Sequence, residues 1–350
     1  IAVNATHLTL SVYFAERQRI GSQFLAESML ELFARRRVAA SVMLRGISGF
    51  GHSGVIRTDQ TLTSSEDPSV EITAVDTAEV IDALSDEVAE MTASGLITVQ
   101  RTTLIGADPT TVVVPDGAGN LSLTLYVGRN RRINGDPAFH LICELLHRNH
   151  FAGASVLLGV DGTSRGQRRR AHFFGRNRDV PLMISAVGSA EDVRRVLPAL
   201  VALEHRPLIT AEPVQVCKRD GRLLAHPPDL PEYDDRGRAV WQKLVVHTSE
   251  STRHDGVPIH RALVRRLRES GHTGGATVLR GIWGFHGDHE PHGDRLFQYG
   301  RRVPVTTVIV DTPRGIGRSF ATIDEVTGTH GLVTWATVPT ALRMTGAKAL

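Results

Sequence analysis

Residues 40–46 (ASVMLRG) decide the fold, because the chain contains this stretch three times. The second copy is residues 154–159 (ASVLLG), and the third is residues 276–281 (ATVLRG). The glycines that close the copies stand at positions 46, 159 and 281, roughly one small domain apart. This spacing exceeds the about 20–50 residues of a solenoid repeat, so the sequence predicts three domains in tandem.

The segments around each copy follow the same order of predicted elements. Apolar and polar side chains alternate from Leu121 to Val127, which is typical of a strand with one buried face. A segment with apolar residues at helical spacing follows in each copy. The equivalent residues Met29, Ile142 and Val264 precede the closing glycine of their copy by the same distance. After the glycine come a polar loop, another strand, a second helix and a last strand.

The order strand–helix–strand–strand–helix–strand is typical of a ferredoxin-like (βαββαβ) domain, which has an α+β fold. We expect repeat 1 at residues 7–105, repeat 2 at 121–217 and repeat 3 at 240–345, joined by linkers at 106–120 and 218–239. Residues 70–75 carry apolar side chains on both faces, so we expect the open faces of the three sheets to pack inward against one another.

The composition is that of an ordinary globular protein, with 350 residues, 41% hydrophobic residues and a formal net charge of +3. This charge is too small to imply a nucleic-acid partner, and no apolar run approaches the roughly 20 residues of a membrane helix. Two cysteines, Cys143 and Cys217, do not form a disulfide framework. Residues 1–10 lack the features of a signal peptide, so we expect a cytoplasmic protein.

Three stretches of repeat 1 carry a resemblance to a known family. Residues 10–17 (LSVYFAER), 42–51 (VMLRGISGFG) and 65–68 (SEDP) resemble the bacterial domain of unknown function 190 family, which is similar in fold to the PII signalling proteins. The likeness continues at residues 279–287 and is weaker in repeat 2. It implies a homotrimer with nucleotides in the clefts between neighbours and a long loop that contacts a target. Here the three protomers are fused, so we expect a monomeric pseudo-trimer.

The loop root after each repeated strand holds the candidate site. Closely spaced glycines let backbone N–H groups approach an anion, and an arginine can hold a phosphate with two hydrogen bonds. The alternative is that the glycines form a bulge where the strand leaves its sheet. The candidate ligand-binding residues are Arg45, Gly46, Gly49, Phe50, Gly51, His52 and Glu66 in repeat 1, and Arg280, Gly281, Gly284, Phe285, His286 and Gly287 in repeat 3.

Two departures from the family pattern narrow this hypothesis. Residues 159–166 of repeat 2 lack the arginine and the Gly-Phe pair, so we expect fewer than three equivalent sites. The PII proteins also hold phosphate with a lysine between their second helix and last strand, whereas residues 91–95 (MTASG) contain none. The ligand is therefore as readily a smaller or cyclic nucleotide, or another anion, as ATP.

Two other clusters of polar residues have simpler interpretations. His286, Asp288, His289, Glu290, His292 and Asp294 are residue types that ligate a transition metal, but loop histidines are commonly just solvated. Residues 165–178 contain six arginines, which could dock an acidic protein surface or anionic lipid, or simply form a charged, exposed loop.

A regulatory protein is the function that the sequence favours. We expect it to bind a small anionic ligand or nucleotide between domains and to contact a protein target, such as a membrane transporter, through long loops. The alternative is a metal-binding protein that resembles the divalent-cation tolerance proteins. Hydrolase, kinase and zinc-protease motifs are missing from the sequence, so we expect neither an enzyme nor a resident cofactor.

Overall fold

The computed structural model describes residues 7–51, 54–58, 67–105, 119–164, 167–168, 180–203, 207–287, 291–293 and 303–346. Predictions for His52, Glu66, Asp288, His289, Glu290 and Asp294 lie outside these residues. Within them, no helix is both long and apolar enough to cross a membrane.

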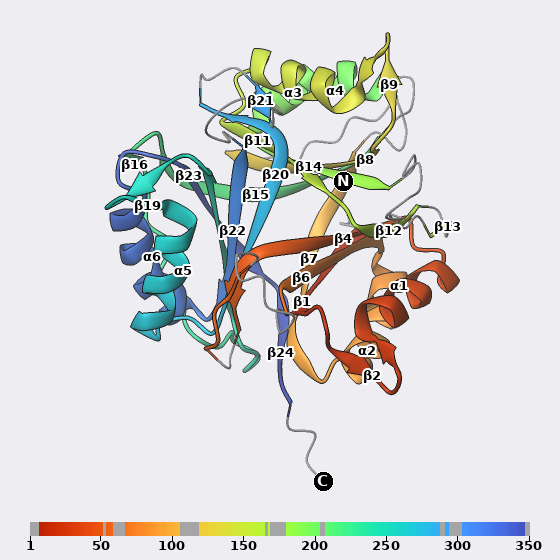
Figure 1. The fold of residues 1–350 in the computed structure, drawn as a ribbon, viewed down its shortest axis with the longest axis vertical. Coiled ribbons are helices and arrows are strands. Elements are labelled where there is room, and N and C mark those ends of the chain that lie inside the picture. Colours follow the sequence, from red (N-terminus) through yellow and green to blue (C-terminus); the bar gives the residue numbers. More distant parts are fainter. Residues whose placement is uncertain are drawn as a thin grey trace.

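Each repeat contains two helices and several strands, in the predicted order (Figure 1). Repeat 1 has β1 (His7–Ala15), β2 (Arg19–Ile20), β3 (Gln23–Phe24), α1 (Leu25–Arg35), β4 (Ala40–Phe50), β5 (Arg57–Thr58), β6 (Ser69–Thr77), α2 (Ala78–Met91) and β7 (Ser94–Ile105). Repeat 2 has β8 (Asn120–Gly128), β9 (Arg132–Ile133), β10 (Asp136–Pro137), α3 (Ala138–Arg148), β11 (Gly153–Leu158), β12 (Asp161–Ser164), β13 (Gln167–Arg168), β14 (Pro181–Ser189), α4 (Ala190–Val201) and β15 (Leu208–Arg219). β16 (Arg222–Leu223) follows, and repeat 3 has β17 (Trp241–Ser249), β18 (Arg253–His254), β19 (Val257–Pro258), α5 (Ile259–Ser270), β20 (Ala276–His286), β21 (His292–Gly293), β22 (Pro304–Asp311), α6 (Pro313–Thr327), β23 (Leu332–Val338) and β24 (Thr340–Thr345).

Thr77, Ser189 and Thr312 are residue types that favour an N-cap, and the second helix of each repeat begins directly after one of them. Ser189 caps α4 with a full capping box, because its hydroxyl accepts from the Asp192 N–H while its own N–H donates to the Asp192 carboxylate. Thr312 caps α6, with Pro313 at the first helical position. Apolar stripes bury the inner faces of these helices against the strands, and each helix pair covers a hydrophobic cluster of its own repeat.

The expected assembly of three separate ferredoxin-like domains into a pseudo-trimer is wrong. Eighteen of the described strands form one continuous sheet, mostly antiparallel, which contains a closed nine-stranded β-barrel, while β2–β3, β9–β10 and β18–β19 are separate two-stranded hairpins. The barrel is closed by the ring β1–β6–β4–β20–β11–β14–β8–β15–β7, whose last strand pairs with its first. Repeats therefore join edge to edge through backbone hydrogen bonds, and the helix pairs lie outside the strands (Figure 1).

The long repeated strand makes the first kind of junction between repeats. In β4, residues 40–45 pair with β6 of the same repeat, whereas residues 46–50 pair with β20 of repeat 3. The end of β20 pairs in turn with β11 of repeat 2, and β12 of repeat 2 pairs with the start of β4. Isolated edges would expose unpaired N–H and C=O groups, and this exchange satisfies them within one chain.

The last strand of each repeat makes the second kind of junction. β7 pairs with β15 at Ile105 and Ile209, β15 continues onto β23, and β24 crosses back to β7. A chamber of about 90 Å³ lies between the strands of the three repeats, and all three contribute side chains to it. Lys243 donates to Gln100 there at 2.5 Å and lies 3.6 Å from Glu212, so these two partly buried charges offset each other.

Candidate functional site

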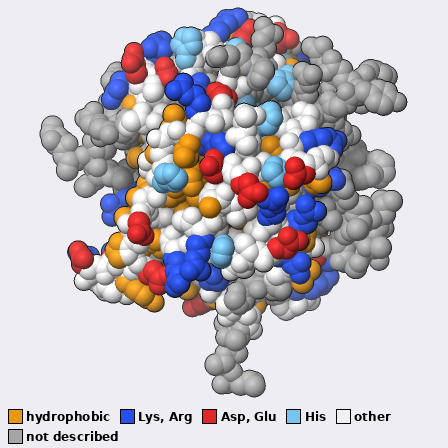
Figure 2. All heavy atoms as spheres, turned by 90° about the vertical axis from the view of Figure 1, so that its left-hand side faces the viewer, with side chains coloured by type: hydrophobic (Ala, Val, Ile, Leu, Met, Phe, Trp, Pro, Cys, Tyr) orange, Lys and Arg blue, Asp and Glu red, His pale blue; other side chains and the backbone are white. Residues whose placement is uncertain are grey.

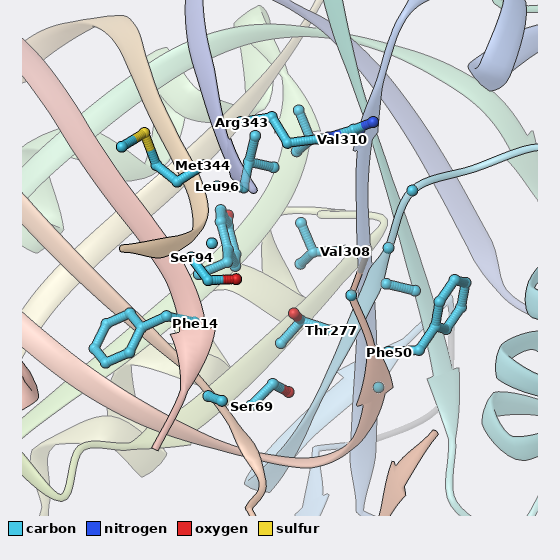
Figure 3. Close-up of a pocket in the computed structure, with 18 of the residues that line it drawn as sticks. Phe14, Phe50, Ser69, Ser94, Leu96, Thr277, Val308, Val310, Arg343 and Met344 are labelled. Atoms are coloured by element: carbon cyan, nitrogen blue, oxygen red, sulfur yellow. The ribbon is translucent and has the colours of Figure 1, made fainter. Parts of the chain in front are cut away.

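A cavity of about 160 Å³ lies at the junction of repeats 1 and 3. We call it the 1–3 cleft; it forms where the end of β4 meets the start of β20 and where β24 crosses β7. Its lining is Tyr13, Phe14, Ala15, Gln18, Gly49, Phe50, Gly51, Ser69, Ser94, Gly95, Leu96, Gly274, Gly275, Ala276, Thr277, Val308, Val310, Arg343 and Met344. Figure 3 shows Arg343 at one end of this cleft and Ser69 at the other.

Backbone forms much of the wall of the 1–3 cleft. Phe14 and Phe50 belong to the hydrophobic clusters beneath the helices of repeats 1 and 3, so they present main chain to the cavity. In Figure 3 their rings lie on opposite sides of it. Gly51 borders space that the described residues leave open, because a Cβ added there would meet none of their atoms within 4 Å. A ligand can therefore approach the peptide groups of these strand ends.

Arg343 supplies the cation of the cleft. Its guanidinium lies 3.2 Å from the Asp311 carboxylate and 5.1 Å from the centre of the Trp241 ring. Asp311 also accepts hydrogen bonds from the Thr273 hydroxyl and the Gly274 N–H, at 2.9 and 2.7 Å. These contacts fix the partly exposed guanidinium at the rim, where its remaining N–H groups can meet an anion.

The structure gives the two predicted arginines a different setting. Arg45 forms an ion pair with Glu16, with its Nε 2.9 Å from the carboxylate. Arg280 forms the corresponding pair with Glu250 at 2.6 Å. Each pair joins two strands of one repeat, and neither arginine lines the 1–3 cleft. Their equivalence is explained by this shared structural contact.

The glycines of the repeated motif lie where strands of different repeats approach closely. A Cβ on Gly49 would stand 2.5 Å from the Ala276 carbonyl oxygen, and one on Gly284 would stand 2.1 Å from that of Ala154. Gly46 and Gly281 are similarly confined by backbone. The alternative to anion binding, a bulge where the strand leaves its own sheet, therefore accounts for these four glycines.

The remaining predicted residues divide between two places. Gly49, Phe50 and Gly51 line the 1–3 cleft. Phe285, His286 and Gly287 lie instead at the junction of repeats 3 and 2, opposite the start of β11. The sequence motif thus marks two separate junctions, and its residues do not converge on one site.

Apart from Gly49, Phe50 and Gly51, the sequence predicted none of the residues that line the cleft, and Gly95, Gly274, Gly275 and Arg343 are the most informative of those it missed. Gly95 ends the stretch that lacks the lysine of the PII proteins, and Arg343 lies opposite the neighbouring Leu96 in the β24–β7 pair. Repeat 3 therefore supplies a cation beside the segment that lacks one in repeat 1. The Gly274-Gly275 pair was the one available signal, since adjacent glycines often mark a close backbone approach.

The other candidate clusters hold no comparable site in the described residues. No three histidine, cysteine, aspartate or glutamate side chains converge in that part of the chain. Arg168, from the arginine-rich loop, pairs with Asp161 at 2.7 Å and lies 3.7 Å from Glu31 in repeat 1. This arginine therefore joins repeats 2 and 1.

The profile of the DUF190 family, described as an uncharacterized ACR, matches residues 7–104, 120–216 and 241–340. The chain belongs to the DUF190 family. One relative is the UPF0166 protein of Aquifex aeolicus (strain VF5), which is 36% identical over 99 residues, 28% of this chain and 90% of the relative. The chain thus contains three DUF190 units in tandem, whereas one unit accounts for most of that relative.

Among solved structures, an anthrone oxidase-like protein matches with a TM-score of 0.17 and 13% identity, over 64% of this chain and 98% of that one. A likeness this low carries no argument about fold or function.

Proposed function

We propose that this DUF190 protein is a PII-like regulator that binds one small anionic ligand in the 1–3 cleft. The observation that carries the proposal is the cleft itself, which combines exposed backbone with the anchored guanidinium of Arg343. Its volume of about 160 Å³ is below the roughly 300–1,000 Å³ of pockets for drug-sized molecules. The cleft therefore suits a small molecule, or one part of a nucleotide.

The position of the cleft connects ligand binding to a loop. Gly51 lines the cleft and directly precedes residues 52–66, where the sequence predicts a polar loop. A ligand that contacts this strand end stabilises the loop states compatible with it, by the difference in its affinity for the two states. We propose that the loop in turn contacts a protein target, for example a membrane transporter.

The described charges on the face that carries α5 and α6 favour a protein target over nucleic acid there. Figure 2 shows Lys and Arg side chains intermingled with Asp and Glu over the described part of the face that carries α5 and α6. Interspersed charges give specificity to a protein contact, whereas nucleic acid requires a continuous basic stripe.

Isothermal titration with AMP, cyclic AMP and inorganic phosphate tests the proposal. We expect one site per chain for at least one probe, and an affinity at least about tenfold weaker in Arg343→Gln, since a charged hydrogen bond contributes roughly 1.5–3 kcal/mol. Arg45→Gln is the matched control, because it removes an arginine outside the cleft and should leave binding unchanged. Arg343→Lys retains the charge if the glutamine variant unfolds. Equal binding by the wild type and both Arg343 variants, or no binding of any probe, would contradict the proposal.

A further inference from the structure

The junction of repeats 3 and 2 has the same construction as the 1–3 cleft. Phe285 pairs with Ala154 as Phe50 pairs with Ala276. Beside them, Arg219 of β15 lies opposite Leu332. Arg343 of β24 lies opposite Leu96 in the same way. We call this second place the 3–2 junction; its strand ends, and even its arginine, correspond to those of the 1–3 cleft.

One position differs decisively between the two junctions. Gly51 follows Phe50 and borders open space, whereas His286 follows Phe285 and carries an imidazole. The His286 ring packs against the start of β11, since a Cβ on Gly153 would lie 3.1 Å from its Nδ1. Its Nε2 lies 3.0 Å from the Thr248 carbonyl oxygen. The imidazole thus lies within the 3–2 junction, at the place where the 1–3 cleft is open.

The hydrogen bond of His286 shows which backbone acceptor the 3–2 junction offers to an imidazole. A carbonyl oxygen can only accept, so the Nε2 of His286 carries the proton and donates it to Thr248. The counterpart of Thr248 in repeat 1 is Phe14, because His247 pairs with Leu332 as Tyr13 pairs with Leu96. Phe14 lines the cleft, so its carbonyl is the acceptor that corresponds to the Thr248 carbonyl.

We infer that His286 is a built-in occupant of the 3–2 junction, and that the open 1–3 cleft binds a planar heteroaromatic ring whose N–H donates to the Phe14 carbonyl. This inference rests on the proposed function and names the part of the ligand that enters the cleft. A side chain attached to the protein has a high effective concentration at its own junction, so it excludes a free ligand there. Arg343 remains at the rim for the anionic group of the same ligand.

Exchanging histidine and glycine between positions 51 and 286 tests the inference. The probes are small heteroaromatic molecules that carry no anionic group. Ligand-observed NMR measures binding of imidazole at pH 9, well above the roughly 6.5 pKa of a histidine imidazole, with 1-methylimidazole as the matched probe that lacks an N–H donor. The variants are Gly51→His, which closes the 1–3 cleft, His286→Gly, which opens the 3–2 junction, and the double exchange. Gly51 has space for the new side chain.

We expect the wild type to bind imidazole at one site and 1-methylimidazole at least about tenfold more weakly, because the donated hydrogen bond is lost. Gly51→His should lose the site, His286→Gly should gain a second, and the double exchange should keep one site. Equal binding of imidazole by the wild type and Gly51→His, or no gain in His286→Gly and His286→Ala variants that retain the native circular dichroism spectrum, would overturn the inference. Failure of the proposed function is distinct, since it appears as loss of anion binding in the titrations while imidazole still binds.

Discussion

At the scale of single residues, the same chemistry has different uses at different positions. Arg45 and Arg280 look like phosphate ligands in the sequence, yet each neutralises a glutamate at the end of the first strand of its repeat. Arg343 has no sequence motif around it, but the crossing of β24 places it at the rim of the 1–3 cleft. Whether an arginine can bind a ligand thus depends on its contacts in the folded chain and not on the sequence motif around it.

His247 makes the stability of the protein depend on pH. Burial, together with the neighbouring His286, lowers the pKa of His247 to about 3, from about 6.5 in an unfolded chain. The unfolded state therefore binds more protons between these values, so stability is full above about pH 6.5 and falls as the pH decreases toward 3. The loss from this residue is of order 5 kcal/mol, at 1.36 kcal/mol per pKa unit.

Urea unfolding at pH 7.5 and pH 4.5 measures this contribution. His247→Gln cannot take up a proton, so we expect the free energy of unfolding to differ less between the two pH values than in the wild type. The control is His272→Gln, a change on an exposed residue. An undiminished difference in His247→Gln would show that other groups cause the acid sensitivity.

At the scale of elements, the repeated strand is defined by its change of partner. β4 pairs with its own repeat over residues 40–45 and with repeat 3 over residues 46–50. The ladder from β4 to β20 shifts register between Val278 and Leu279, beside Gly46. The glycines allow this crossing, which brings the end of β4 into the 1–3 cleft.

Substitution by alanine should affect stability differently at Gly49, which lies in β4, and at Gly51, which directly follows this strand. Gly49→Ala places a Cβ 2.5 Å from the Ala276 carbonyl, so we expect a loss of roughly 1–3 kcal/mol from overpacking. The new Cβ of Gly51→Ala meets no atom of the described residues within 4 Å, so this variant should change stability by less than about 0.5 kcal/mol. Chemical denaturation compares the two variants. Equal effects would mean that the approach of β4 to β20 does not require glycine.

At the scale of the whole molecule, the closed ring makes the three repeats interdependent. Each repeat shares backbone hydrogen bonds with both others, so no repeat can unfold without exposing strand edges in its neighbours. Each of the three largest hydrophobic clusters nevertheless draws most of its residues from one repeat and from that repeat's helix pair, which explains why the repeats remain recognisable in the sequence.

Scanning calorimetry should therefore show one cooperative transition. Leu123→Ala leaves a cavity in the core of repeat 2, where this leucine is fully buried, and costs about 2–5 kcal/mol. Because the sheet is shared, we expect the entire transition to move to lower temperature. A separate early transition for repeat 2 would contradict this coupling between repeats.

The sequence by itself determined the three repeats, the order of their elements and the N-caps at Ser189 and Thr312. These features depend on periodicity and on contacts a few residues apart, which are visible in a local stretch of chain. The triple recurrence of residues 40–46 also correctly marked a strand that all three repeats need.

Only the tertiary structure decided how these strands pair beyond their own repeat. Backbone hydrogen bonds between strand edges carry little sequence signal, so nothing local distinguishes separate domains from one closed sheet. The same pairing brings Gly51 and Arg343 from opposite ends of the chain into one cleft, and places His286 where the equivalent space would be. The binding site is therefore a consequence of barrel closure, which fixes distances that the sequence leaves open.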